Sequence, residues 1–266
     1  LTFSETTRRI ITIAIYAFFT IYTLYKLLQE PSPEGKLCYG LLLIIFMGVA
    51  LWAEYLRILY QKMITALNMD CDAGLAKHYY NILKKRDFMK SYRTTQLIFD
   101  TLYYQDIGKP QTCIELLESN EKTFRSSLDY LLIRNYTYFY SYYKLGNRTK
   151  VKHWYPEVMK LKDTKIKGSK VSPLYNWEFI EAVYLSCMKD YKKSLAKFKQ
   201  IDTRYMNNRE MAQYYTEFGK VYKELNDKEN AVIMFTKAME TGKQLSSSRE
   251  AGACFHRLGN ETGDTI

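Results

Sequence analysis

The sequence contains little glycine, proline or histidine, and its cysteines are widely separated. Twelve glycines and five prolines in 266 residues are too few for a fold rich in strands and turns, which favours helices. The five cysteines include no CxxC pair and no Cys/His cluster, which argues against a disulfide framework and a zinc site. The three histidines are far apart, and no HExxH, GxSxG or phosphate-binding loop occurs. We therefore expect a helical protein that is not an enzyme and binds neither a metal nor a cofactor.

Two apolar stretches near the N-terminus are long enough to cross a bilayer. Ile10–Leu28 contains one charge, Lys26, and Leu37–Ala53 contains none. At about 1.5 Å per residue, both reach the shortest length that spans a bilayer core. Two prolines and a glycine make the connection a tight, non-helical turn. We expect residues 1–56 to form a transmembrane hairpin; the alternatives are a buried hairpin of a soluble core and a cleaved signal peptide.

Basic residues flank the outer ends of this expected hairpin. Arg8 and Arg9 precede the first stretch, and Arg57 and Lys62 follow the second, whereas the connection carries two glutamates and one lysine. Because Lys and Arg favour the cytoplasmic side, both termini are expected in the cytoplasm. The expected localisation is an integral membrane protein, in the plasma membrane. No Gly or Pro follows Ala53 until residue 74, so the second helix is expected to continue unbroken beyond the membrane.

Beyond residue 57, apolar residues recur at helical spacing in pairs of segments. The clearest pair is Tyr215–Glu240, with a tight turn at Asn226–Asp227. Small residues, Gly219 and Ala231, allow the two backbones to approach. The apolar faces of its two helices carry Tyr215, Phe218, Gly219 and Tyr222, then Ala231, Phe235 and Ala238.

This pattern resembles the tetratricopeptide repeat (TPR), in which aromatic and small residues recur over about 34 residues. Looser copies cover Arg93–Asn120, Leu131–Met159, Asn176–Ile201 and a half-unit, Ser247–Ile266. The half-unit has an expected turn at Gly259–Asn260 and is expected to cover the preceding helix, with Phe255 reaching the Phe235–Ala238 face. The resemblance implies that residues 57–266 form an all-α solenoid of antiparallel helix pairs, tethered to the membrane hairpin. The alternative is an irregular helical array of another type.

The resemblance also implies a concave groove, lined by the first helix of each repeat. The groove positions carried onto this chain are Ile98, Leu102, Tyr136, Tyr140, Tyr143, Lys144, Phe179, Val183, Lys220, Lys223, Arg249 and Arg257. The tyrosines either pack against a neighbouring helix or form an adhesive groove floor. In the second case, the cations at the far end would capture an acidic residue or a terminal carboxylate.

The net charge is +11, and the surplus lies beyond residue 56. A possible anionic-surface patch consists of Lys160, Lys162, Lys165, Lys167 and Lys170, within a segment, Lys160–Pro173, that is expected to be a loop. The preferred hypothesis is a membrane-tethered protein–protein interaction scaffold that binds a peptide or partner protein in the groove. The alternative is a basic helical-repeat module that binds nucleic acid or anionic lipid headgroups. Nucleic acid is the less favoured partner because no recognised motif accompanies the charge.

Overall fold

The computed structural model describes residues 5–162, 164–166, 169–170 and 174–262. Over these residues the chain is almost entirely helical, as the scarcity of glycine and proline predicts. It divides into two compact units, residues 1–60 and 61–266. Helix α2 belongs to both units, because its last eight residues, Gln61–Asn68, lie in the second.

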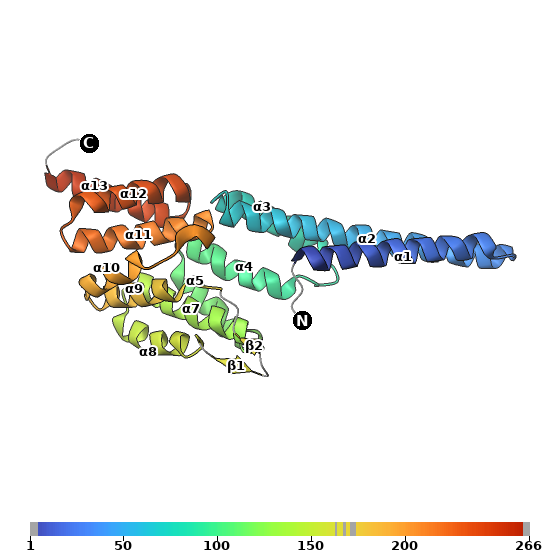
Figure 1. Ribbon diagram of the computed structural model, residues 1–266, viewed down its shortest axis with the longest axis horizontal. Coiled ribbons are helices and arrows are strands. Elements are labelled where there is room, and N and C mark those ends of the chain that lie inside the picture. The colour runs from blue at the N-terminus through green and yellow to red at the C-terminus, as the bar shows by residue number, and fades with distance from the viewer. Residues whose placement is uncertain (1–4, 163, 167–168, 171–173, 263–266) are drawn as a thin grey trace. The chain divides into compact units, whose positions relative to one another are not determined.

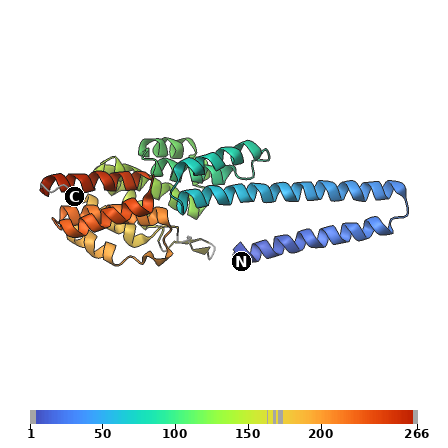
Figure 2. The same ribbon diagram turned by 90° about the horizontal axis from the view of Figure 1, so that it is seen from above.

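The first unit is a helical hairpin. Helix α1 spans Glu5–Gln29 and α2 spans Pro33–Asn68, so the second helix is unbroken beyond its apolar stretch, as the sequence predicts (Figure 2). Aromatic rings join the two helices: the ring centroids of Phe19 and Phe46 are 3.9 Å apart, and Tyr16 contacts Phe46 edge to face.

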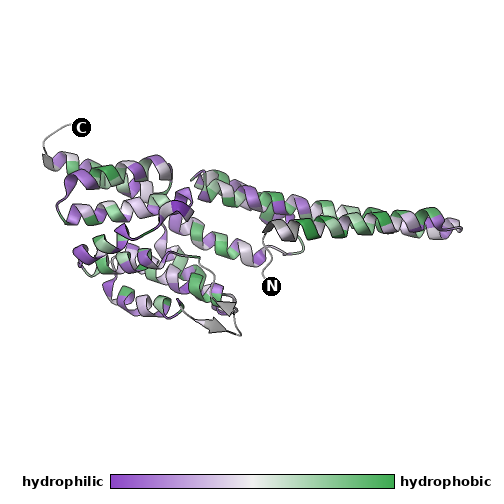
Figure 3. Cartoon of the chain, in the orientation of Figure 1, coloured by the Kyte–Doolittle hydropathy of each residue, from purple (hydrophilic) through white to green (hydrophobic). Residues whose placement is uncertain are grey.

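Both helices of this unit are long and apolar enough to cross a membrane. Figure 3 shows the apolar residues along them and the polar connection between them. Only 6% of the residues in each apolar window are buried, and Phe18 and Ile44 are 73% and 69% exposed. The core helix of a soluble protein would instead bury most of its apolar side chains.

The second unit is an array of helices that follow one another in antiparallel pairs (Figure 1). The helices are α3 (Ala73–Arg86), α4 (Arg93–Asp106), α5 (Pro110–Ser119), α6 (Glu121–Phe124), α7 (Leu128–Lys144), α8 (Arg148–Met159), α9 (Trp177–Cys187), α10 (Tyr191–Lys199), α11 (Asn208–Glu224), α12 (Lys228–Gly242) and α13 (Ser246–Thr262). A short 3₁₀ helix, η1 (Thr203–Tyr205), precedes α11. The pairs α4–α5, α7–α8, α9–α10 and α11–α12 cover the four segments in which the sequence predicts two helices each.

The turns within these pairs follow from local chemistry. Gly108, Gly146 and Asn226 have φ angles of 78°, 70° and 60°, a left-handed conformation that Gly and Asn adopt most readily. Asn147 and Asp227 then cap the next helices, since their side chains accept hydrogen bonds from backbone N–H groups of the first turn. These residues end one helix and begin the next within two or three positions.

Two segments differ from the sequence prediction. The expected loop after α8 contains a pair of two-residue antiparallel strands, β1 (Lys165–Ile166) and β2 (Ser169–Lys170). The expected turn at Gly259–Asn260 is wrong, because both residues lie inside α13. This helix packs along α12 and α11, and it buries Ala251 and Leu258 completely or nearly so. Packing of this face sustains the helix through residues that favour turns in isolation.

Helix α4, from the early part of the second unit, is in direct contact with α11 and α13 from its end. The buried Arg209 of α11 forms an ion pair with the buried Asp106 of α4 at 3.4 Å. Ser246 of α13 donates a hydrogen bond to the Gln105 carbonyl at 3.2 Å, and Asn208 donates to the Met69 carbonyl at 2.6 Å. The array therefore closes upon itself, with the first helices of its pairs turned inward.

Candidate functional site

The closed array places much of the expected groove in its interior. Tyr136, Tyr140, Phe179 and Val183 are at most 6% exposed. These four side chains belong to the hydrophobic core and do not line an open groove, which corrects the interpretation of the sequence. The physical reason is that α7 reaches α11 directly across the inner side of the array.

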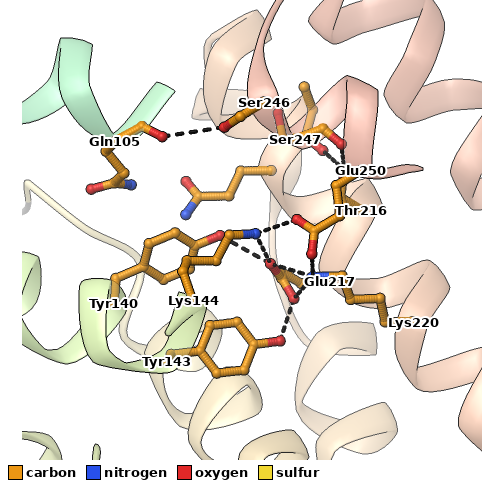
Figure 4. Close-up of polar contacts among 12 residues, drawn as sticks. Gln105, Tyr140, Tyr143, Lys144, Thr216, Glu217, Lys220, Ser246, Ser247 and Glu250 are labelled. Carbon is orange, nitrogen blue, oxygen red and sulfur yellow. Dashed lines mark hydrogen bonds and ion pairs between the residues drawn. The ribbon is translucent and has the colours of Figure 1, made fainter. Parts of the chain in front are cut away.

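Hydrogen bonds make this contact specific. The Tyr140 hydroxyl donates to Glu217 Oε1 at 3.0 Å, and the Tyr143 hydroxyl donates to the other oxygen of the same carboxylate (Figure 4). One turn earlier, Gln213 Nε2 donates to the Tyr136 hydroxyl at 3.3 Å. Of the two interpretations offered for these tyrosines, their geometry agrees with packing against a neighbouring helix.

Glu217 is the centre of a charged cluster that joins three helices. Lys144 of α7 and Lys220 of α11 contact its carboxylate at 3.3 and 3.0 Å. Glu250 of α13 contacts both lysines, at 2.6 Å for Lys220 (Figure 4). Two carboxylates thus face two ammonium groups. We call Tyr140, Tyr143, Lys144, Glu217, Lys220 and Glu250 the Glu217 cluster.

The environment keeps Glu217 ionised. Burial of its carboxyl group disfavours the charged form, but Lys220 and Lys144, with hydrogen bonds from Tyr143 and Lys220, hold its pKa at about 2. Burial and the adjacent Glu217 raise the pKa of Tyr140 and Tyr143 well above the ordinary value of 10.0, so both phenols remain donors. Glu217 therefore stays charged and the two phenols stay protonated near neutral pH, which gives this part of the cluster a structural role.

A basic pocket lies beside this cluster, and we regard it as the candidate functional site. Its volume is about 360 Å³, and its lining residues are Tyr143, Gly146, Arg148, Ser186, Cys187, Tyr191, Lys220, Lys223, Glu224, Cys254 and Arg257. Tyr143, Lys220, Lys223 and Arg257 were expected in the groove, and the structure brings these four together. They come from α7, α11 and α13, and Arg148 is added by α8.

The charges that line the pocket are unequal. Arg148, Lys223 and Arg257 form no ion pair with any other residue within the described ranges. The one acidic lining residue, Glu224, lies near Tyr191, another lining residue. Guanidinium groups offer planar pairs of N–H donors that fit a carboxylate or phosphate. Unpaired cations around a concave space can therefore bind an anionic group, whereas the neighbouring Glu217 cluster cannot.

The remaining groove positions lie elsewhere. Ile98 and Leu102 are half-buried on α4, and Ile98 packs against a separate apolar cluster around Leu117. Arg249 is exposed and donates a hydrogen bond to the Ile107 carbonyl at 3.2 Å. The structure does not bring these residues to the basic pocket.

The expected lysine patch is described in part. Lys160 and Lys162 are exposed, and Lys160, which directly follows α8, pairs with Glu157 at the end of that helix. Lys165 and Lys170 lie in β1 and β2, and Lys167 lies outside the described residues.

A larger cavity of about 470 Å³ lies near the N-terminal ends of α9 and α11. Aromatic rings line it, and the centroids of Tyr136 and Tyr175 are 3.8 Å apart. Two of its carboxylates have local partners: Asp202 pairs with Arg204, and Glu210 belongs to the capping box of α11. These two carboxylates thus stabilise the starts of helices, and Arg209, which also lines the cavity, is paired with Asp106. The basic pocket remains the stronger candidate.

Metal ligation has no geometric support in the described part of the chain, where no group of three or more His, Cys, Asp or Glu could hold an ion. The five cysteines are free. Burial raises the pKa of Cys71 to about 11 and that of Cys113 to about 12, so these thiols are poor nucleophiles. Cys113 packs at the α4–α5 contact, where its thiol lies 3.5 Å from the Thr101 carbonyl.

Sequence reasoning missed Glu217, Glu250 and Arg148. A signal for Glu217 was present, because it shares a helical face with Tyr214, Phe218 and Val221, all buried. An acidic residue at such a position requires a buried partner. Nothing local marks Arg148, which follows a turn and resembles any exposed cation.

In comparisons with known proteins, no family model, no curated protein and no solved structure matches this chain.

Proposed function

We propose that this chain is a membrane-anchored scaffold without enzymatic activity, which binds an acidic segment of a partner protein in the basic pocket. Its first unit crosses the bilayer twice, and its second unit is a TPR-like solenoid on the cytoplasmic side. The observation that carries the proposal is the set of unpaired cations, Arg148, Lys223 and Arg257, around a concave space.

The exposure of the apolar helices supports membrane insertion. Isoleucine, leucine and phenylalanine side chains face outward along α1 and α2, and burial in lipid removes them from water at about 25 cal/mol per Å². Their backbone groups are satisfied within each helix, as a bilayer core requires. Arg8, Arg9 and Arg57 at the outer ends favour cytoplasmic termini.

The close contacts within the helix pairs support a TPR-like arrangement. Gly219 of α11 lies against Phe235 of α12, where a Cβ atom would approach the ring to 2.6 Å. In the preceding pair, Ser194 donates a hydrogen bond to the Ala182 carbonyl at 2.8 Å. Small residues at the crossing of paired helices are the feature on which the resemblance rests. Because the array is closed, the proposed binding surface is the basic pocket and not the long groove that the sequence led us to expect.

An acidic segment fits this pocket better than a neutral one. Lys220 is committed to Glu217 and Glu250, and Glu224 offsets one charge, so the three unpaired cations leave an excess of two positive charges. The pocket volume accommodates one or two carboxylate side chains, or a terminal carboxylate, rather than a folded domain.

Binding of a labelled acidic peptide to the full chain in lipid nanodiscs tests the proposal. Fluorescence anisotropy would be measured for a peptide that ends in three glutamates and for its glutamine counterpart. We expect the acidic peptide to bind, and Arg257→Glu or Arg148→Glu to weaken binding about tenfold, roughly 1.4 kcal/mol.

Lys199→Glu is the matched control, because Lys199 is exposed on α10, outside the pocket, and the charge change is the same. Equal affinity for the two peptides, or an equal loss in Lys199→Glu, would refute the pocket as the binding site. Tighter binding of single-stranded nucleic acid, lost steeply with salt, would favour the alternative function instead.

A further inference from the structure

The larger cavity, near the N-terminal ends of α9 and α11, has walls of flat rings, and we call it the aromatic cavity. Its volume is about 470 Å³, and its aromatic lining residues are Tyr136, Tyr175, Trp177, Phe179 and Tyr205. The rings of Tyr136 and Tyr175 are stacked, with their centroids 3.8 Å apart. A cavity of this size accommodates a small molecule, and planar walls favour an aromatic one.

A buried cation lines the aromatic cavity and has a donor to spare. Arg209 is 6% exposed, and its Nη1 donates to the two carboxylate oxygens of Asp106 at 3.4 and 3.5 Å. Its Nε is buried and has no hydrogen-bond partner among the described residues. Nearly all buried N–H groups in folded proteins have an acceptor, because leaving one unpaired is costly. The unpaired donor therefore points to an acceptor that a ligand supplies.

Two tyrosine hydroxyls add to this surplus of donors. The Tyr136 hydroxyl accepts a hydrogen bond from Gln213 Nε2 at 3.3 Å but donates to no described residue. The Tyr175 hydroxyl forms no hydrogen bond within the described ranges. Burial raises the pKa of both phenols above the ordinary value of 10.0, so both keep their protons. Donors from α7, α11 and the segment before α9 are thus available to an acceptor such as a carboxylate.

The acidic residues that line the aromatic cavity favour a positive charge as well. The Asp202 carboxylate is already paired, and Glu210 belongs to the capping box of α11. Glu178, half-buried in the first turn of α9, forms no ion pair or hydrogen bond with another described side chain. Because Asp106 neutralises Arg209, the lining carries more negative than positive charge. A purely anionic ligand would be repelled, whereas an ammonium group beside the rings is attracted both by the carboxylates and by the ring faces.

We propose that the aromatic cavity binds a small aromatic zwitterion, of the size and chemistry of a free aromatic amino acid. Arg209 and the two tyrosine hydroxyls bind its carboxylate, and Glu178 binds its ammonium group. Its ring lies among the aromatic walls. The site is separate from the basic pocket, because the two share no lining residue. Since the ligand contacts both α9 and α11, its binding adds to the stability of the array.

Isothermal titration calorimetry of the full chain in lipid nanodiscs tests this proposal with three probes. L-tryptophan carries both charges, L-tryptophanamide lacks the carboxylate, and N-acetyl-L-tryptophan lacks the ammonium group. We expect L-tryptophan to bind, and each of the other two to bind at least about tenfold more weakly, because each loses one charge-assisted hydrogen-bonding group.

Two variants assign the contacts. Glu178→Gln should weaken the binding of L-tryptophan about tenfold and leave that of N-acetyl-L-tryptophan unchanged, because the second probe has no ammonium group. Tyr205→Ala should weaken all three probes, because it removes part of the aromatic wall. Tyr205 is 86% exposed, so this variant leaves the core intact.

Glu240→Gln is the matched control for Glu178→Gln, because Glu240 is an exposed carboxylate on α12, outside the aromatic cavity. Arg257→Glu, in the basic pocket, should also leave the binding of L-tryptophan unchanged, so failure of one site is distinguishable from failure of the other.

Three results would overturn the proposal. If L-tryptophan does not bind, or if its amide binds equally well, the aromatic cavity is not a carboxylate site. Equal affinity for N-acetyl-L-tryptophan would overturn the role of Glu178. An equal loss of affinity in Glu178→Gln and Glu240→Gln would show that L-tryptophan responds to overall charge and does not occupy the cavity.

Discussion

Glu217 shows how one buried carboxylate can decide the geometry of a surface. It is 2% exposed and accepts hydrogen bonds or ion pairs from α7 and from its own helix. Without such partners, a buried charge of this kind would cost several kcal/mol. The tyrosines of α7 are therefore held inside the unit by a specific acceptor, and the lysines that neutralise it are withdrawn from solvent.

We expect the stability of the protein to depend on the ionisation of Glu217. Its folded-state pKa of about 2 lies below the ordinary value of 4.5, so its contribution is fully present above about pH 4.5. The contribution is lost as the pH falls through about 2, and the gap corresponds to roughly 3 kcal/mol of unfolding free energy. Urea unfolding of the full chain in detergent, followed from pH 7 down to pH 2, measures this loss.

Glu217→Gln should be less stable at pH 7, by about 3 kcal/mol, and should have a flatter acid limb. Glu240→Gln is the control, because Glu240 is an exposed carboxylate on α12. It should retain the pH profile of the unchanged protein. Identical acid limbs for the two variants would show that Glu217 does not govern this transition.

At this scale, the sequence predicts which side chains share a helical face but not what they meet. Tyr140, Tyr143 and Lys144 share one face of α7, as their helical spacing predicts. Their common partner lies 73 to 77 residues further along the chain, on α11. Helical periodicity carries no information about contacts at that separation. The sequence therefore cannot tell whether the inner face of α7 lines an open groove or packs against α11.

The crossing of α11 and α12 is the tightest feature at the scale of elements. A Cβ atom on Gly219 would lie 2.6 Å from Phe235 Cε1 and 3.2 Å from Met234 Cβ. Phe235 is fully buried and has no space to retreat. The glycine is therefore required by the distance between the two helices, although it is a poor helix former.

Gly219→Ala should destabilise the second unit. Overpacking at a buried crossing costs about 1–3 kcal/mol, which exceeds the gain of roughly 1 kcal/mol in helix propensity. The contrasting variant is Gly252→Ala on α13, where the nearest atom is the flexible Met239 Sδ at 3.3 Å. We expect that variant to be neutral or stabilising. Thermal unfolding compares the two, and hydrogen exchange in α12 should rise only in Gly219→Ala; the reverse order would contradict the close-packing argument.

Elements were predicted well wherever local chemistry defines them. Gly108, Gly146 and Asn226 mark turns that the structure contains, because each must adopt a left-handed backbone conformation. Gly259–Asn260 carries a similar signal and gave a wrong turn. There the adjacent Leu258 is 3% exposed against the rest of the unit, and this tertiary packing outweighs the local preference.

At the scale of the whole molecule, we expect both termini on the cytoplasmic side. One cysteine would be introduced at Ser32, in the connection between the two apolar helices, or at Lys199, in the second unit, after replacement of the exposed Cys38 and the partly exposed Cys187 and Cys254 by serine. A membrane-impermeant maleimide applied to intact cells should label Ser32→Cys. Lys199→Cys should react only after permeabilisation, because positive charges flank the outer ends of the hairpin.

Labelling of Lys199→Cys in intact cells, without labelling of Ser32→Cys, would show that the topology is the reverse of the one expected. Labelling of neither position before permeabilisation would place the hairpin in an internal membrane or outside any membrane. Either result leaves the geometry of the basic pocket unchanged, because all its lining residues belong to the second unit.

Closure of the second unit also sets a schedule for its synthesis. Asp106 is made 103 residues before Arg209, its buried partner. Because a chain is synthesised at about 5–20 residues per second, Arg209 is added roughly 5–20 s after Asp106. The inner face of α7 waits similarly for Glu217, and the array is complete only when α13 has left the ribosome. The contacts that close the unit therefore form only after its last helices have been synthesised. Until then the tyrosine-rich face of α7 is exposed, and a chaperone that binds nascent chains would have to cover it.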